Sequence, residues 1–142
     1  MLRNIPKILP PELVKTMMEM GHSDFMIIAD ANFPGSAHAK RIIRMDGVKI
    51  PELLEAVMQL FPLDKFVENP VQLMVNLPTE PVPKIWETYK EIVNKYDKDH
   101  AFRDFECIDR MLFYNKAENA YVIVQTGDES RYANIILQKG IC

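Results

Sequence analysis

Two side chains that handle protons stand at either end of one apolar segment. His22 precedes the run "FMIIA", residues 25–29, and Asp30 follows it directly. Imidazole takes up and releases protons near neutral pH, which makes histidine the commonest general acid or base in catalysis. A carboxylate accepts hydrogen bonds from the hydroxyl groups of a ligand. The pair therefore suggests proton transfer on a small polar molecule.

Each of these two residues also has an ordinary structural interpretation. His22 follows a helix end at Gly21, where the terminal carbonyls favour a cation. Asp30 fits a turn in which the side chain bonds the local backbone. A straight strand over residues 25–29, rising ~3.3 Å per residue, would separate the two side chains by roughly 20 Å. Either the segment bends, or each side chain acts with partners from elsewhere, such as a neighbouring subunit.

A second set of polar residues lies nearer the C-terminus. Tyr132 and Asn134 are two positions apart, so a strand over 132–137 would place both on one side. A phenol and a carboxamide together suit hydrogen bonding to sugar hydroxyls, and an exposed strand end is the alternative. Arg110 offers further donors, although an exposed, solvated arginine is the commoner fate. Asp64 is interpreted by default as a loop carboxylate.

Composition and charge exclude several classes of function. The 142 residues suit one domain over residues 1–142. A net charge of −3 without any basic block disfavours nucleic acid as a partner. No apolar run approaches the ~20 residues of a membrane span, and the first residues do not resemble a secretory leader, so we expect a cytoplasmic protein without a membrane partner.

Metal and nucleotide motifs are missing from the sequence. The histidines and cysteines are scattered without metal-ligand spacing, at His22, His38, His100, Cys107 and Cys142. The glycine-rich loops that bind nucleotide phosphates are absent as well. We therefore expect neither a metal nor a cofactor.

Helical segments alternate with short apolar strands along the chain. The patterns predict helices over 11–20, 51–61, 84–96 and 110–119, and strands over 25–29, 41–45, 71–77, 105–109, 120–126 and 132–137. Residues 30–40 are expected to form a loop, and Trp86 to be a boundary residue of its amphipathic helix. This alternation is typical of an α/β domain with a central, largely parallel sheet flanked by helices.

Six segments taken in order carry a family resemblance: "PELVKTMMEMGHSD", "IIADANFPG", "IRMDGV", "PELLEAVMQLFPLD", "DRMLFYNKAENAYVIVQTG" and "RYANIILQKG". Together they resemble the L-fucose mutarotase family, a sibling of the bacterial D-ribose pyranases. The resemblance covers most of the chain and leaves residues 76–104 as the diverged part. It implies the fold shared by these two families. It also implies interconversion of the α and β anomers of a free monosaccharide, without a cofactor.

The resemblance also implies roles for particular residues. His22 is the implied acid/base residue. The residues implied to bind sugar hydroxyls are Asp30, Arg110, Tyr132 and Asn134, and two weaker matches are Asp64 and Tyr121. Members of the family form rings, typically decamers of two stacked pentamers, with sites near subunit boundaries. Such an assembly would account for the separation of His22 from Asp30.

Small sequence differences between the fucose and ribose branches of the family bear on which sugar is the substrate. Asn32-Phe33-Pro34 favours the fucose branch, because the ribose branch usually has Gly-Leu-Pro there. Ala133 is instead typical of the ribose branch, and His38 stands downstream of the usual fucose-branch position. L-fucose is the expected substrate, and pyranose–furanose exchange of D-ribose is the alternative. A sugar-binding protein without catalysis and a structural oligomer subunit are the non-enzymatic alternatives.

Overall fold

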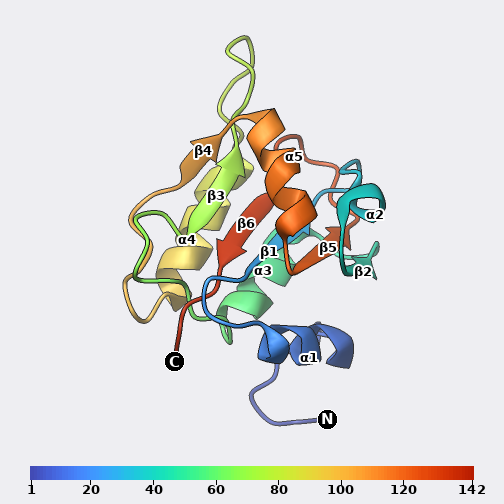
Figure 1. The fold of residues 1–142 in the computed structure, drawn as a ribbon, viewed down its shortest axis with the longest axis vertical. Helices are drawn as coiled ribbons and strands as arrows, with labels where there is room; N and C mark the ends of the chain where they lie inside the picture. The colour runs from blue at the N-terminus through green and yellow to red at the C-terminus, as the bar shows by residue number, and fades with distance from the viewer.

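The computed structural model describes residues 1–142 and contains a six-stranded sheet with helices on both faces (Figure 1). In chain order the elements are α1 (Pro11–Glu19), β1 (Phe25–Ala29), α2 (Gly35–His38), β2 (Ile42–Met45), α3 (Ile50–Met58), β3 (Val71–Met74), α4 (Ile85–Tyr96), β4 (Glu106–Ile108), α5 (Arg110–Asn119), β5 (Val122–Thr126) and β6 (Ile135–Gln138). The strand order across the sheet is β2-β5-β1-β6-β3-β4. None of the helices has the length and apolar character that a membrane crossing requires.

All strands except β6 run in the same direction. β5 is parallel to β2 and β1, and β3 is parallel to β4, whereas β6 is antiparallel to its neighbours β1 and β3. The expected largely parallel sheet is therefore confirmed, with one reversed strand inside it. As a consequence, the carboxyl ends of the parallel strands and the amino end of β6 meet at one end of the sheet. We call this the carboxyl end, and the opposite one the amino end.

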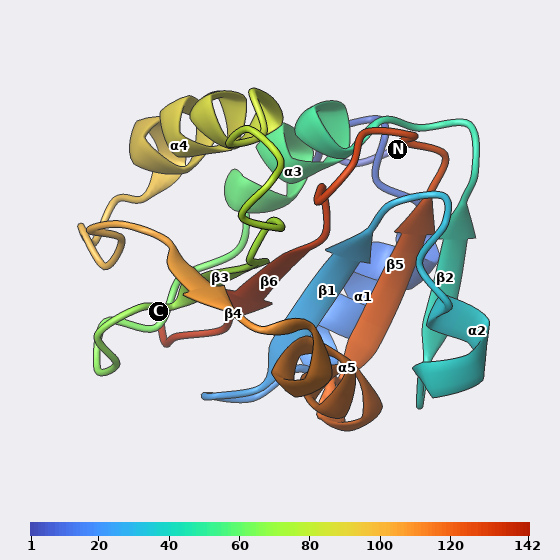
Figure 2. The same ribbon diagram turned by 90° about the horizontal axis from the view of Figure 1, so that it is seen from above.

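Both faces of the sheet are covered, which explains why the central strands are apolar on both sides. Met26 and Ile28 of β1 belong to the larger core, which α1, α3 and α4 cover. Ile27 and Ala29 belong to the smaller core on the opposite face, under α5 and the segment that leads into α2 (Figure 2). Alternate residues of one strand thus enter different cores, and "FMIIA" is a continuous apolar run for this reason.

Local signals set the beginnings of the helices. α1 and α3 each have proline in the first turn and a glutamate beside it, Glu12 and Glu52, near the positive end of the helix. α5 begins after Asp109, whose carboxylate accepts a hydrogen bond from the Leu112 N–H at 2.9 Å. This cap places Arg110 in the first turn of α5, at the carboxyl end of the sheet.

Two local predictions were wrong. Residues 35–38 form the short helix α2 instead of a loop, and four residues are too few to show helical periodicity. β6 begins at Ile135, so Tyr132 and Asn134 precede the strand. Tyr132 has a φ of 53°, in the left-handed region, which an extended strand does not permit.

Candidate active site

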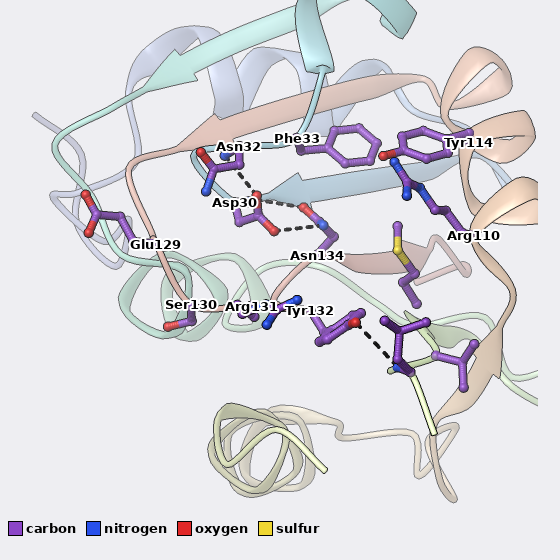
Figure 3. A pocket seen from close by; sticks show the side chains of 13 residues that line it. Asp30, Asn32, Phe33, Arg110, Tyr114, Glu129, Ser130, Arg131, Tyr132 and Asn134 are labelled. Atoms are coloured by element: carbon purple, nitrogen blue, oxygen red, sulfur yellow. Dashed lines mark hydrogen bonds between the residues drawn. The ribbon is translucent and has the colours of Figure 1, made fainter. Parts of the chain in front are cut away.

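The carboxyl end of the sheet carries a cleft of about 390 Å³, a volume typical of small-molecule sites (Figure 3). Four segments line it: the end of β1 with the loop that follows, the segment after β3, the first turns of α5, and the loop between β5 and β6. Ligands of parallel sheets commonly bind at this position. The sequence-predicted residues that line the cleft are Asp30, Arg110, Tyr132 and Asn134.

Asp30 and Asn134 are joined by two hydrogen bonds at the floor of the cleft. The Asp30 N–H donates to Asn134 Oδ1 at 2.8 Å, and Asn134 Nδ2 donates to Asp30 Oδ2 at 2.9 Å. The N–H of Asn32 donates to the other carboxylate oxygen at 2.9 Å, so the turn interpretation of Asp30 also holds. The residues are separated by 104 positions in the chain, and their pairing fixes the geometry of both side chains.

Burial increases the proton affinity of the Asp30 carboxyl group. Loss of solvation raises its pKa above the ordinary value of 3.8, and the Asp128 carboxylate adds to this shift. Hydrogen bonds from Asn32, Phe33 and Asn134 act in the opposite direction without cancelling it. The cleft therefore contains an acceptor that is fixed in orientation and holds a proton more readily than a solvated aspartate.

One side of the cleft is aromatic. The rings of Phe33 and Tyr114 stack with centroids 5.5 Å apart and 15° between their planes. The Arg110 guanidinium carbon lies 5.3 Å from the centroid of the Tyr114 ring, and Figure 3 shows it beside that ring. Sequence reasoning assigned no role to Phe33 or Tyr114. The signal for Tyr114 was its spacing, because it follows Arg110 by four residues and so shares its helix face.

Tyr132 is placed by residues that lie outside the six sequence segments quoted for the family resemblance. The Leu77 N–H donates to the Tyr132 hydroxyl at 3.4 Å, and Leu77 itself lines the cleft. Trp86 Nε1 donates to the Tyr132 carbonyl at 2.8 Å, and the Tyr89 hydroxyl donates to the next carbonyl, that of Ala133, at 2.7 Å. Sequence reasoning missed all three contacts, which join residues 44 to 55 positions apart.

His22 lies at the amino end of the sheet, away from the cleft. Residues 25–29 form a strand, so the segment does not bend and His22 stays at the opposite end of β1 from Asp30. The His22 side chain is 44% exposed, and its Nε2 lies 3.2 Å from Asp64 Oδ1. The Phe66 ring meets the imidazole edge-on, with centroids 5.5 Å apart. Within one chain, the predicted acid/base residue and the predicted binding residues do not converge.

Asp64 is a buried carboxylate that contacts His22. Its side chain is inaccessible to solvent, and it accepts hydrogen bonds from the Phe66 N–H at 3.0 Å and Gln138 Nε2 at 3.1 Å. Burial alone would raise the pKa of Asp64, but these donors and His22 outweigh it and hold the pKa below 3.8. Asp64 is therefore not an idle loop carboxylate, as its local sequence suggested, but an ionised acceptor for the imidazole.

Tyr121 is the remaining predicted residue, and it does not line the cleft. It directly precedes β5, and the Arg41 guanidinium carbon lies 4.1 Å from the centroid of its ring. Arg41 Nη1 also donates to the Tyr121 carbonyl at 3.3 Å. No group of three His, Cys, Asp or Glu side chains lies close enough together to hold a metal ion.

An α/β domain with a polar cleft at the carboxyl ends of its strands is a small-molecule-binding domain. Residues 3–142 match the RbsD / FucU transport protein family, and the chain belongs to this family.

Individual relatives resemble the chain over nearly its whole length. The fucose mutarotase of Danio rerio is 40% identical, over 99% of this chain and 94% of the relative. The fucose mutarotase of Streptococcus pneumoniae, solved in complex with L-fucose, superposes with a TM-score of 0.93 at 44% identity over 99% of both chains. Bacillus subtilis RbsD, complexed with D-ribose, shares the fold, with a TM-score of 0.71 at 19% identity over 94% of this chain and 95% of its own. The expected fold is confirmed.

Proposed function

We propose that this protein is a mutarotase, an isomerase that interconverts the α and β anomers of free L-fucose. The observation that carries the proposal is the whole-chain match to a fucose mutarotase that was solved with L-fucose bound. The cleft supports it independently, because carboxylate, amide, phenol and guanidinium groups gather there beside an aromatic surface. These groups suit a ligand with several hydroxyls and one apolar face.

The reaction requires two proton movements and one reversible bond cleavage. The anomeric hydroxyl loses a proton, the ring oxygen gains one, and the bond between the anomeric carbon and the ring oxygen breaks to give a free aldehyde. Rotation of the aldehyde and attack by the same hydroxyl on the other face close the ring with the opposite configuration. The net reaction consumes no proton, electron or co-reactant, so side chains that exchange protons suffice.

His22 is the proposed acid/base residue. It protonates the ring oxygen while the proton of the anomeric hydroxyl passes to a water molecule, either directly or through the Tyr132 phenol, which gives up its own proton as it accepts the other; the roles reverse on closure. Two features support this assignment: the imidazole is partly exposed, and its Nε2 faces an ionised carboxylate, Asp64. A carboxylate at this distance accepts a hydrogen bond from the imidazole and orients the ring.

The proposed binding residues keep hydrogen-bonding capacity for a sugar. The two Asp30 carboxylate oxygens have two lone pairs each, which is more acceptor capacity than the bonds from Asn32, Phe33 and Asn134 use. Asn134 Nδ2 donates one hydrogen to Asp30 and retains the other. Arg110 supplies donors at the cleft margin, and Tyr132 has a hydroxyl that both donates and accepts.

We further propose that the complete site is shared between subunits of a ring, in which His22 of one subunit faces the cleft of the next. The separation of His22 from the cleft within one chain supports this arrangement, as does the exposure of Phe66 (64%) beside His22 and of Leu77 (56%) at the cleft. Contacts between two different surfaces close into rings when the rotation between subunits allows it. The family resemblance suggests a decamer of two pentamers, one domain of residues 1–142 per subunit, and a cytoplasmic location.

Saturation-transfer NMR on free sugars at equilibrium tests the proposed function. The wild-type protein is expected to accelerate exchange between the α and β anomers of L-fucose far above the rate without protein. D-ribose is the second substrate to test, because Ala133 is typical of the ribose branch, and pyranose–furanose exchange would then be accelerated instead. Saturable binding of L-fucose with an unchanged exchange rate would contradict the proposal and identify a sugar-binding protein.

A further inference from the structure

Helix α4 holds the backbone of the cleft loop through two aromatic side chains. Trp86 and Tyr89 are three residues apart and therefore lie on one face of the helix. Their polar hydrogens bind two successive carbonyls, those of Tyr132 and Ala133, at 2.8 and 2.7 Å. Tyr89 is fully buried and Trp86 is 9% exposed, so water does not compete readily for these bonds.

The backbone held in this way has a conformation that a tyrosine does not adopt readily. Tyr132 has a φ of 53°, and the left-handed region is unfavourable for a residue with a bulky side chain. Such a conformation persists only when surrounding contacts fix it. Trp86 binds the carbonyl of Tyr132 itself, and Tyr89 binds the carbonyl of the next residue, so α4 holds the strained residue and the peptide unit that follows it.

Tyr89 is a dependable donor in this position. Burial raises the pKa of its hydroxyl well above the ordinary value, and the nearby carboxylates of Asp128 and Asp30 add to the shift. The hydroxyl therefore stays protonated at neutral pH and remains available as a donor.

We propose that Trp86 and Tyr89 are positioning residues, which hold Tyr132 in its left-handed conformation and thereby aim its phenol, together with Asn134, at the sugar. The inference rests on the proposed function of the cleft. It assigns a task to α4, which lies in residues 76–104, outside the six sequence segments on which the family resemblance was first based. The alternative is that the two side chains only pack against the core.

The same helix provides a matched control. The Tyr96 hydroxyl donates to Glu55 Oε1 of α3 at 2.9 Å, at a distance from the cleft loop. Tyr96→Phe removes a side-chain hydrogen bond of α4, as Trp86→Phe and Tyr89→Phe do, without touching residues 129–134. Any effect specific to the cleft loop must therefore be absent from Tyr96→Phe.

Hydrogen exchange on the unliganded protein tests the structural half of the inference. Loss of one neutral hydrogen bond corresponds to a roughly 2- to 12-fold change in a local opening equilibrium. We expect Trp86→Phe and Tyr89→Phe to speed amide exchange over residues 129–134 by this factor, and Tyr96→Phe to leave that segment unchanged. Equal exchange in all three variants and the wild type would overturn the inference.

Kinetics with L-fucose test the functional half. Trp86→Phe is expected to raise KM several-fold with a smaller change in kcat, because it loosens a binding group. In a Tyr132→Phe background the same substitution should have little further effect on KM, since the phenol that it positions is gone. Additive effects on KM would show that Trp86 acts independently of Tyr132 and would overturn the inference.

A fluorescence measurement on the wild-type protein tests the inference even if one of the variants does not fold. Trp86 is the only tryptophan in the chain, so the tryptophan fluorescence comes from this side chain alone. Saturation with L-fucose is expected to change the emission of Trp86, and an unchanged emission in a protein that exchanges L-fucose anomers would contradict the inference. If the wild type does not accelerate anomer exchange at all, the proposed function fails, whereas amide exchange still decides whether α4 holds the loop.

Discussion

The two ends of β1 carry the two halves of the proposed site. At the carboxyl end, Asp30 belongs to a cleft built by segments from across the chain, with fixed hydrogen-bonding groups and an aromatic side. At the amino end, His22 is partly exposed, and its imidazole contacts the buried carboxylate of Asp64. In the proposed mechanism one end binds the sugar and the other moves a proton, so a complete site requires both.

The aspartates at the two ends illustrate how environment decides the state of one residue type. Both are buried, yet burial dominates at Asp30 and raises its pKa, whereas donors and His22 dominate at Asp64 and lower its pKa. Asp64 is thereby kept ionised beside an imidazole, which suits the proposed role of His22 in proton transfer. Asp30 is suited instead to binding hydroxyls, because its contribution depends on fixed geometry.

Removal of the imidazole should have the largest effect on catalysis. His22→Ala is expected to lower the rate of L-fucose anomer exchange by about 10²–10⁴-fold, the usual contribution of general acid–base catalysis. KM should change little, because the side chains proposed to bind the sugar hydroxyls remain intact. Saturation-transfer NMR measures both quantities, and His100→Asn is the control for loss of an unrelated histidine. Anomer exchange at the wild-type rate in His22→Ala would contradict the assignment of proton transfer to His22 at the amino end.

Weakening the cleft should change binding rather than chemistry. Arg110→Ala is expected to raise KM for L-fucose by roughly tenfold or more, the effect of losing hydrogen bonds from a charged donor, with a much smaller change in kcat. Arg103→Ala, which removes an exposed arginine outside the cleft lining, provides the comparison. A fall in kcat at unchanged KM would contradict the binding role of Arg110 and indicate that it takes part in proton transfer.

The smallest expected effect is on the pH dependence of the free energy of unfolding. Here Asp64 at the amino end and Asp30 at the carboxyl end should act in opposite directions. A lowered pKa in the folded state means that Asp64 stabilises the protein above pH 3.8 and that this contribution disappears as pH falls through the folded-state pKa. A raised pKa means that Asp30 contributes most below pH 3.8 and that this contribution is lost as pH rises through its folded-state pKa.

The matched variants Asp64→Asn and Asp30→Asn make this contrast measurable. Urea unfolding from neutral pH to about pH 3 gives the free energy of unfolding of each variant relative to the wild type. The stability advantage of the wild type over Asp64→Asn should shrink as the pH falls, and its advantage over Asp30→Asn should grow. Movement of both differences in the same direction would contradict the environments assigned to the two carboxylates.

Local sequence patterns predicted the elements well, and long-range contacts account for what they missed. The strand "FMIIA" and the proline-initiated helices have signals within a few residues, and these elements were predicted close to their observed bounds. The separation of His22 from Asp30 also followed from the rise of a strand. The short helix α2 escaped prediction because four residues carry no periodicity.

Contacts between distant residues left no local signal. His22 and Asp64 are 42 positions apart, and Trp86 and Tyr132 are 46 positions apart. The left-handed backbone at Tyr132 is likewise imposed by α4 and could not be anticipated from "YANIIL". Tyr132 and Asn134 do line the same cleft, although the strand that was expected to align them begins after both.

A mixed-subunit experiment tests most directly the claim that the cleft of one subunit and His22 of its neighbour form one site. His22→Ala retains an intact cleft, and Asp30→Ala retains an intact imidazole, so each alone should be almost inactive in L-fucose exchange. Co-expression with two affinity tags gives mixed rings, in which half the clefts and, independently, half the neighbouring imidazoles are intact. Mixed rings should therefore recover roughly a quarter of the wild-type rate. Mixed rings as inactive as either parent would contradict the account, because each site would then lie within a single chain.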